Sequence, residues 1–270
     1  MSNKKISLFL FLNQLRLKVT FLGTGTSQGI PVIGSKHPVC LSDNPKDKRL
    51  RVSVLIEWDS YTYVIDCGPD FRYQMLRAKC TKIDGVIFTH EHADHTAGLD
   101  DIRPFFFKQG DIPIYAHKRV IKELENRFGY IFQSENKYPG APAVNKNEIT
   151  NEPFKLGGDM MVLPINGLHY NLQVFGYRFK DFAYLTDMNA IDETELNKLN
   201  NLDVLVINAL RESEHPSHFN LKQALEIIKI LSPKRAYLTH ISHLLGFHDD
   251  VQQKLPENVY LAYDNLQITI

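Results

Sequence analysis

Cysteine is scarce in this sequence. Cys40, Cys67 and Cys80 are the three in 270 residues, and their spacing is irregular. A small secreted protein held together by disulfides usually carries a larger, even number of cysteines at regular spacing. The scarcity therefore argues against a disulfide framework and favours a reducing, cytoplasmic location.

The sequence also lacks an excess of charge of either sign. Its 31 lysines and arginines balance 31 aspartates and glutamates, which gives a formal net charge of +0 and a pI of about 7.2. No overall positive field would attract nucleic acid. We therefore expect no stable nucleic-acid partner, although a neutral net charge does not exclude a local basic groove.

No apolar run is long enough to cross a membrane. The longest near the N-terminus, Ile6 to Leu12, follows Lys4 and Lys5 and resembles the core of a signal peptide. It is too short to span a bilayer, and no small-residue cleavage site follows it. We expect no membrane partner, and we interpret residues 1–16 as an N-terminal extension before a single domain over residues 17–270.

Metal-ligand side chains are concentrated in one short stretch. His90, His92, Asp94 and His95 lie within six residues, directly after the apolar run Gly85 to Phe88, which predicts a short buried strand. Imidazole nitrogen and carboxylate oxygen are ligands for zinc and other divalent cations. Because Asp94 and His95 are adjacent, we expect them to diverge, which favours two neighbouring ions over one. The alternative is a solvated polar loop.

The remaining sequence alternates between predicted strands and a few well-separated amphipathic helices. This order favours two packed sheets with helices outside them. The aromatic run Phe105 to Phe107 predicts core packing, with a substrate platform as the alternative. Strands are predicted over residues 17–22, 53–57, 61–65, 85–88, 112–116, 161–165, 172–179, 182–186, 204–208 and 236–238 and within 259–270, and helices over 71–79, 119–128, 193–199 and 221–231.

The His-x-His-x-Asp-His pattern resembles the signature of the metallo-β-lactamase fold hydrolases. The resemblance implies an α/β fold, a four-layer αββα sandwich with a metal site at the edge between its sheets. Three further ligand-type residues each follow an apolar run, as this fold would require. The resemblance implies that His90, His92 and His169 hold one Zn²⁺ or Mn²⁺ ion, that Asp94, His95 and His240 hold another, and that Asp187 bridges them.

Asp66 follows a predicted strand and begins Asp-x-Gly, which suits a carboxylate that orients a neighbouring metal ligand, although an ordinary turn looks similar. The bridging residue in the resemblance is Asp187, not cysteine. This differs from the β-lactam-cleaving members and agrees with the phosphodiesterases and the glyoxalase-type thioesterases.

Two features favour a phosphodiesterase. The segment His215 to Ala224 places His218 near a helix start, which resembles ribonuclease Z and, more closely, the phosphoribosyl cyclic phosphodiesterase of the carbon–phosphorus lyase pathway. The 17 residues between His169 and Asp187 leave no room for the arm with which ribonuclease Z typically grips tRNA. We therefore favour a small substrate.

The sequence thus predicts a dinuclear metal-dependent hydrolase that cleaves small, cyclic phosphodiesters by metal-bound hydroxide. Asp94 and His218 are the predicted catalytic residues, His218 as the acid that protonates the leaving group. The alternatives are a glyoxalase-like thioester hydrolase, a ribonuclease Z-like nuclease and a non-enzymatic metal-binding protein. The resemblance also suggests a homodimer.

A second metal site is suggested by a degenerate motif. Ser35, His37 and Cys40 align with a Cys-x-Cys-x-x-Cys segment that the cyclic phosphodiesterase uses, with the position of His243, for a structural zinc. Serine is a poor zinc ligand. Two alternatives therefore remain. His37, Cys40 and His243 hold a third, structural Zn²⁺, or this site has been lost.

Overall fold

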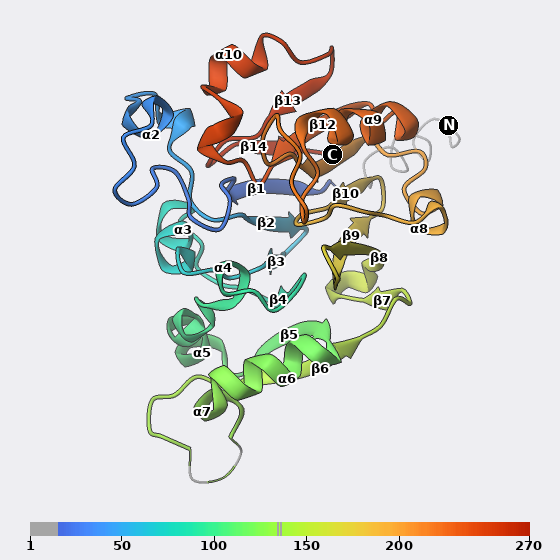
Figure 1. Ribbon diagram of the computed structural model, residues 1–270. Helices are drawn as coiled ribbons and strands as arrows, with labels where there is room; N and C mark the ends of the chain where they lie inside the picture. The colour runs from blue at the N-terminus through green and yellow to red at the C-terminus, as the bar shows by residue number, and fades with distance from the viewer. Residues whose placement is uncertain (1–15, 134, 136) are drawn as a thin grey trace, which may run out of the picture.

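Two β-sheets lie face to face in the molecule, and helices cover their outer faces (Figure 1). The computed structural model describes residues 16–133, 135 and 137–270, so almost all of the predicted N-terminal extension lies outside the described residues. Within them, each sheet has seven strands. The predicted four-layer αββα sandwich is confirmed.

The first sheet contains the N-terminal half of the chain and the last strand. Its order is β14 (Gln267–Thr269), β1 (Lys18–Gly23), β2 (Ser53–Trp58), β3 (Tyr61–Ile65), β4 (Gly85–Ile87), β5 (Ile112–His117) and β6 (Val144–Ile149). The order of the second sheet is β13 (Val259–Leu261), β12 (Arg235–Thr239), β11 (Val204–Asn208), β10 (Phe182–Tyr184), β9 (Leu172–Phe179), β8 (Met161–His169) and β7 (Phe154–Lys155).

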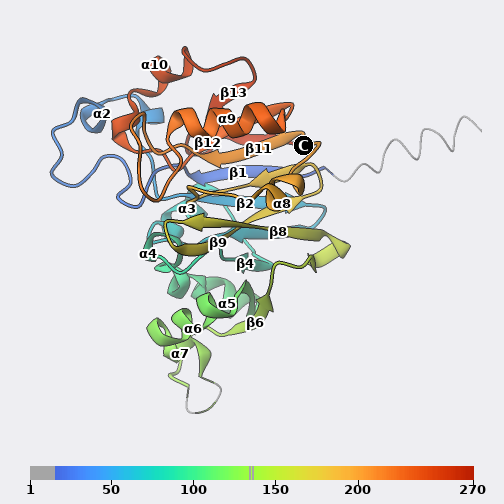
Figure 2. The same ribbon diagram turned by 45° about the vertical axis from the view of Figure 1, so that its right-hand side comes forward.

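The helices lie at opposite ends of the two views. In Figures 1 and 2, α9 (Leu221–Leu231) and α10 (His248–Gln252) are at the top, and α5 (Arg103–Gln109), α6 (Lys118–Arg127) and α7 (Gly129–Phe132) are at the bottom. The remaining short helices are α2 (Pro38–Leu41), α3 (Phe71–Arg77), α4 (Ala93–Thr96), α8 (Glu193–Asn197) and the 3₁₀ turns 45–47, 99–102, 157–159 and 243–245. None of the helices in the described part of the chain is long and apolar enough to cross a bilayer.

Three apolar clusters correspond to the three interfaces between the four layers. In β11, Val204 and Val206 pack between the sheets, whereas Leu205 and Ile207 pack in the cluster that contains α9. Successive strand side chains point to opposite faces, so a strand buried on both sides is apolar throughout. This explains why the central strands were predictable as continuous apolar runs.

One edge strand of each sheet, β6 and β7, was not predicted. β6 has the polar sequence Val-Asn-Lys-Asn-Glu-Ile and pairs only with β5, at the edge of the first sheet. An edge strand can face water, so it needs no apolar pattern. Strand β8 also runs further than predicted, to His169 instead of Ile165, because its last four residues pair in register with β9.

Strand direction brings the ends of distant strands together. β3 runs parallel to β4, and β10 runs parallel to β11 and β12. β8 and β10 are both antiparallel to β9, so they share a direction. The carboxyl ends of strands with one direction meet at one edge of a sheet. His169 at the end of β8 and the residues that follow β10 and β12 therefore gather at the same place.

Candidate metal centre

Three residues of the centre directly follow or closely follow a strand and have left-handed backbone. Asp66 follows β3 with φ of 62°, Asp187 lies three residues after β10 with φ of 55°, and His240 follows β12 with φ of 55°. Positive φ is uncommon outside glycine, although aspartate and histidine tolerate it better than most residues. Each of these residues therefore lies where the chain turns after a strand.

The His90–His95 stretch turns from β4 into the short helix α4. His92 is the residue before that helix and has extended backbone, with φ of −60° and ψ of 150°. The hydroxyl of Thr96 donates to the carbonyl of His92 at 2.9 Å, which fixes the turn. Asp94 and His95 are adjacent residues of α4, and the ends of their side chains meet, with His95 Nε2 3.3 Å from Asp94 Oδ2. The expected divergence of these two side chains is wrong.

The structure brings all seven predicted ligands into adjoining groups. Within each group, one ligand atom of every residue lies within 4.8 Å of the others. His169 and Asp187 each belong to two groups and so link them. The groups are His90, His92 and His169; Asp94, His95, Asp187 and His240; and His169, Asp187 and His218.

Neighbouring contacts fix which imidazole nitrogens face the centre. His95 Nδ1 lies 2.6 Å from Asp66 Oδ2, and a carboxylate oxygen only accepts, so this nitrogen donates. His169 Nδ1 likewise donates to the carbonyl of Ser217 at 2.7 Å. Asp66 is itself held by the amide and hydroxyl of Thr89, at 2.9 and 2.8 Å. The Nε2 atoms of both histidines therefore remain for the centre, as in metal sites whose ligands are oriented by a carboxylate or carbonyl.

The nitrogens that face the centre are buried and poorly partnered. In the described part of the chain, Nε2 of His90 has no hydrogen-bond partner, and Nε2 of His95 and of His240 lies 3.1 Å from an Asp187 oxygen without forming a well-aligned hydrogen bond. Those residues are at most 1% exposed. A buried polar atom without a partner costs about 1–3 kcal/mol. A cation bound by these nitrogens and by Asp187 would remove that cost.

The electrostatics of the group favour positive charge at its centre. Burial opposes charging His240, but Asp187 and Asp94 outweigh it and raise its pKa to about 9. The same balance between burial and three carboxylates raises the pKa of His95. Burial lowers the pKa of His169 to about 4, so that imidazole is neutral near pH 7. The carboxylates that attract protons here would also attract a divalent cation, whose binding would release those protons.

His218 lies beside the second group. Its Nε2 is 3.2 Å from Asp187 Oδ1, and its ring stacks on His240 with centroids 4.8 Å apart. It lies in the segment that precedes α9, two residues before the cap residue Asn220. Its neighbours His215 and Ser217 contact it at 3.0 Å, and sequence reasoning did not assign them a role. Their position within three residues of His218 was the available signal.

The degenerate second site is only partly assembled. The rings of His37 and His243 meet edge to face with centroids 4.9 Å apart. The buried Cys40 Sγ instead accepts from the amide of Val32 at 3.5 Å. Among the described residues, no group with ligand atoms within 4.8 Å contains these three side chains. A third metal ion there stays a prediction.

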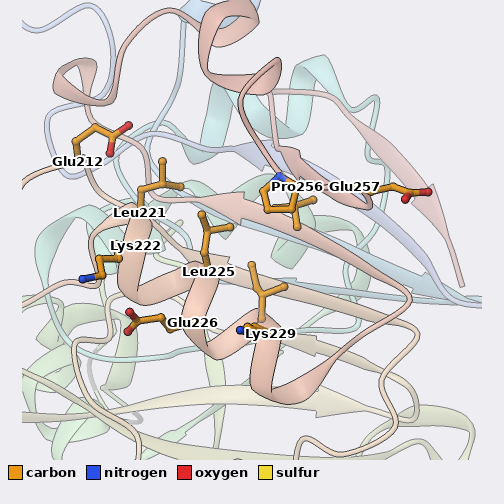
Figure 3. Close-up of a pocket in the computed structure, with 10 residues that line it drawn as sticks. Glu212, Leu221, Lys222, Leu225, Glu226, Lys229, Pro256 and Glu257 are labelled. Atoms are coloured by element: carbon orange, nitrogen blue, oxygen red, sulfur yellow. The ribbon is translucent and has the colours of Figure 1, made fainter.

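A groove of about 570 Å³ lies elsewhere, along α9 (Figure 3). Its apolar lining comes from Leu221, Leu225 and Ile228, and Glu226, Lys229 and Glu257 surround it. It includes none of the clustered histidines or aspartates. We assign it no part in the chemistry of the centre.

Comparison with known proteins agrees with this geometry. A family model described as the β-lactamase superfamily domain matches residues 61–241, which is more than half of the chain. The chain belongs to the β-lactamase superfamily. A solved structure described as a new diphosphatase from the PhnP family is 39% identical, with a TM-score of 0.88, and the match covers 94% of this chain and 97% of that one.

Two curated relatives are longer than this chain. An octanoyltransferase of Porphyromonas gingivalis is 37% identical over 94% of this chain and 52% of its own length. A ribonuclease BN of Cronobacter sakazakii is 28% identical over 61% of this chain and 50% of its own length. The chain thus spans about half the length of these curated relatives. With ribonuclease Z proteins also among the relatives, the predicted superfamily and its ribonuclease Z-like branch are confirmed.

The fold implies divalent metal ions, and the residues present fit them. The buried Nε2 atoms of His90, His95 and His240, together with the oxygens of Asp94 and Asp187, make a nitrogen and oxygen donor set. This set suits zinc and similar first-row ions. The chain therefore combines the fold of its superfamily with a donor set that suits divalent metal ions.

Proposed function

We propose that this protein hydrolyses small phosphodiesters, cyclic ones in particular, at a centre that holds two divalent ions. His90, His92 and His169 would hold one ion, Asp94, His95 and His240 the other, and Asp187 would bridge them. Zn²⁺ and Mn²⁺ both suit these donors. When bound, such ions lower the pKa of a coordinated water and stabilise phosphoryl oxygens.

The observation that carries the proposal is His218. It adds an imidazole to the centre beyond the seven predicted ligands, with Nε2 3.2 Å from Asp187 Oδ1. A sugar alkoxide is a poor leaving group and needs a proton as its bond to phosphorus breaks. His218 would donate that proton from Nε2, and a positioned acid contributes about 10²- to 10⁴-fold in rate. Asp94 would act at its own ion, beside His95 and His240.

The proposed substrate is small because the chain has no tRNA-gripping arm at the expected place. The residues between His169 and Asp187 form β9 and β10, and Phe179 and Phe182 pair across a tight hairpin. The similar diphosphatase suggests diphosphate esters as a second substrate class. Their hydrolysis also breaks a bond between phosphorus and oxygen, but the leaving group is a phosphate.

The test is turnover of a substrate panel by protein reconstituted with Zn²⁺ or Mn²⁺. The panel contains a 2′,3′-cyclic nucleotide, a linear phosphodiester, a diphosphate diester, precursor tRNA and an acyl thioester. We expect the cyclic phosphodiester to be cleaved fastest. Faster cleavage of precursor tRNA would favour the nuclease, faster cleavage of the thioester would favour a thioesterase, and faster cleavage of the diphosphate would move the substrate class to diphosphates.

A further inference from the structure

The ligands predicted for the first ion come from both sheets. His90 and His92 follow β4 in the first sheet, whereas His169 is the last residue of β8 in the second. The rings of His92 and His169 meet edge to face, with centroids 5.0 Å apart. Ligand distances in metal sites vary by only about 0.2 Å, so the two sheets must be held at a fixed separation to form this site.

Two hydrogen bonds join the sheets just before these ligands. The hydroxyl of Tyr177 donates to the carbonyl of Phe88 at 2.5 Å, and the amide of Phe175 donates to the carbonyl of Thr89 at 3.1 Å. Both donors belong to β9 in the second sheet. Both acceptors precede His90, so these bonds fix the end of the strand but not the turn that follows it.

Arg119 connects the turn itself to the second sheet. Its Nη1 atom lies 3.2 Å from Glu91 Oε1, and its Nη2 atom donates to the carbonyl of Gln173 at 2.5 Å. In the chain, Glu91 stands between the ligands His90 and His92. One guanidinium thus contacts the ligand-bearing turn of the first sheet and a strand of the second.

The contact on the second sheet lies beside the third ligand. In the register of β9 against β8, Gln173 pairs with Leu168, and the next pair is Leu172 with His169. The Gln173 carbonyl therefore belongs to the strand pair that ends at His169. Because a guanidinium is planar and rigid, its two nitrogens hold Glu91 and Gln173 at a fixed separation.

The helix that carries Arg119 is firmly anchored on the first sheet. Val120, Ile121 and Leu124 of α6 are buried in the apolar cluster on the outer face of that sheet. The Glu91 side chain is 16% exposed, and among the described residues its Oε2 atom is buried without a hydrogen-bond partner. Removal of the Arg119 charge would leave this carboxylate poorly solvated, so the turn would move to expose it to water.

We propose that Arg119 is a positioning residue that sets the separation of His90 and His92 from His169, and with it the affinity for the first ion. The proposal rests on the assignment of these three histidines to one ion in the proposed function. The residue touches neither the ion nor the substrate, and it acts through the two segments that carry the ligands.

The second ion should depend much less on Arg119. Its predicted ligands Asp94 and His95 lie on α4, beyond the turn that contains Glu91. That helix has a separate support, since the amide of Cys67 donates to the carbonyl of His95 at 2.8 Å. A change at Arg119 should therefore alter one site and leave the other unchanged, whereas a general loosening of the fold would alter both.

The test uses protein loaded with ¹¹³Cd²⁺, whose NMR spectrum should show one resonance for each ion. His169→Ala should remove the first resonance and Asp94→Ala the second, which assigns them. Arg119→Met keeps the length of the side chain but neither its charge nor its donors. We expect it to shift or broaden the first resonance alone, and chelator competition should show one of the two ions bound about 10- to 100-fold more weakly.

Arg119→Lys separates the span from the charge. Lysine keeps the positive charge, but its ammonium lacks the planar fork that holds Glu91 and the Gln173 carbonyl together. We expect most of the loss to remain in Arg119→Lys, whereas Lys122→Ala, at an exposed position of the same helix, should match the wild type. Full recovery by lysine, or equal weakening of both ions, would overturn the proposal.

The readouts do not depend on turnover. Circular dichroism of each variant checks that it is folded, and if Arg119→Met does not fold, Glu91→Gln breaks the ion pair from the other side and should shift the same resonance. If the resonances respond as expected but no phosphodiester is cleaved, the proposed function fails while the positioning by Arg119 stands. An unchanged first resonance in a protein that cleaves phosphodiesters would reverse that outcome.

Discussion

Three of the clustered imidazoles have their Nδ1 atom held by a fixed partner. Nδ1 of His90 contacts the Thr89 hydroxyl at 3.0 Å, Nδ1 of His95 contacts Asp66, and Nδ1 of His169 contacts the carbonyl of Ser217. Each partner lies outside the ligand set and restrains the ring, so Nε2 points to the centre without further ordering. Partners of this kind orient the ligands of a metal site, and their loss typically weakens metal binding.

Substitution of His218 should separate the acid from the ligands. In His218→Ala, both ions should remain, because their predicted ligands are intact. Turnover of substrates with an alkyl leaving group should fall by about 10²-fold or more, and turnover of a nitrophenyl phosphodiester should fall much less. Steady-state rates on the two substrates, with metal content measured on the same samples, check this.

His117→Ala is a matched control, since this histidine lies at the end of β5 outside all three ligand groups. Equal losses on both substrates for His218→Ala would mean that this residue binds or positions the substrate. No loss on either would remove His218 from the site and favour the thioesterase.

Helix α6 supports the metal-binding stretch from outside at two points. Arg119 Nη1 lies 3.2 Å from Glu91 Oε1, and Arg127 Nη1 donates to the Thr96 hydroxyl at 3.1 Å. That hydroxyl in turn holds the carbonyl of His92. The two arginines are eight residues apart, which spans about 12 Å of helix. One helix therefore holds both ends of the stretch that carries four predicted ligands.

The element-scale prediction is that Arg127→Ala weakens zinc binding by about tenfold, since outer contacts to ligands are worth roughly that much. Competition with a chromophoric chelator measures the affinity. Lys122→Ala is the control on the same helix, because Lys122 is an exposed residue of α6. Equal affinities for Arg127→Ala and Lys122→Ala would show that α6 does not set the geometry of the ligands.

For the whole molecule, metal binding should stabilise the fold. The centre joins residues that follow β4 in one sheet and β8, β10 and β12 in the other, so a bound ion ties the two sheets together. Ligands that bind only the native state stabilise it by about 2.7 kcal/mol at one hundred times Kd. We expect a higher Tm with Zn²⁺ than with a chelator, and elemental analysis should give at least two ions per chain.

Two variants assign these ions. Asp94→Ala should lower the count by one, and Cys40→Ser should lower it only if the third site binds zinc. A plateau at one ion that Asp94→Ala leaves unchanged would contradict the dinuclear centre.

The sequence by itself determined the fold class and the identity of the clustered residues. The central strands are buried on both faces, so they appear in the sequence as apolar runs. A polar residue that follows such a run lies at the edge of the sheet where the strands end. His169, Asp187 and His240 could be selected on this basis, and the motif around His90 supplied the family. The prediction of core packing for the aromatic run holds only in part, because Phe105 is buried whereas Phe107 is 63% exposed.

Only the tertiary structure decided which of these residues meet and through which atoms. The ends of the Asp94 and His95 side chains meet beside Asp187 and His240 from distant strands, and the strand β6 is held by pairing with β5 despite its polar sequence. The loop that carries His215 and His218 is held by His169, which donates to the carbonyl of Ser217, and by the carbonyl of Met188, which accepts from the amide of Phe219. The pattern of apolar residues in one segment indicates which of its side chains are buried. Strand order and register decide which segments, distant in sequence, lie side by side.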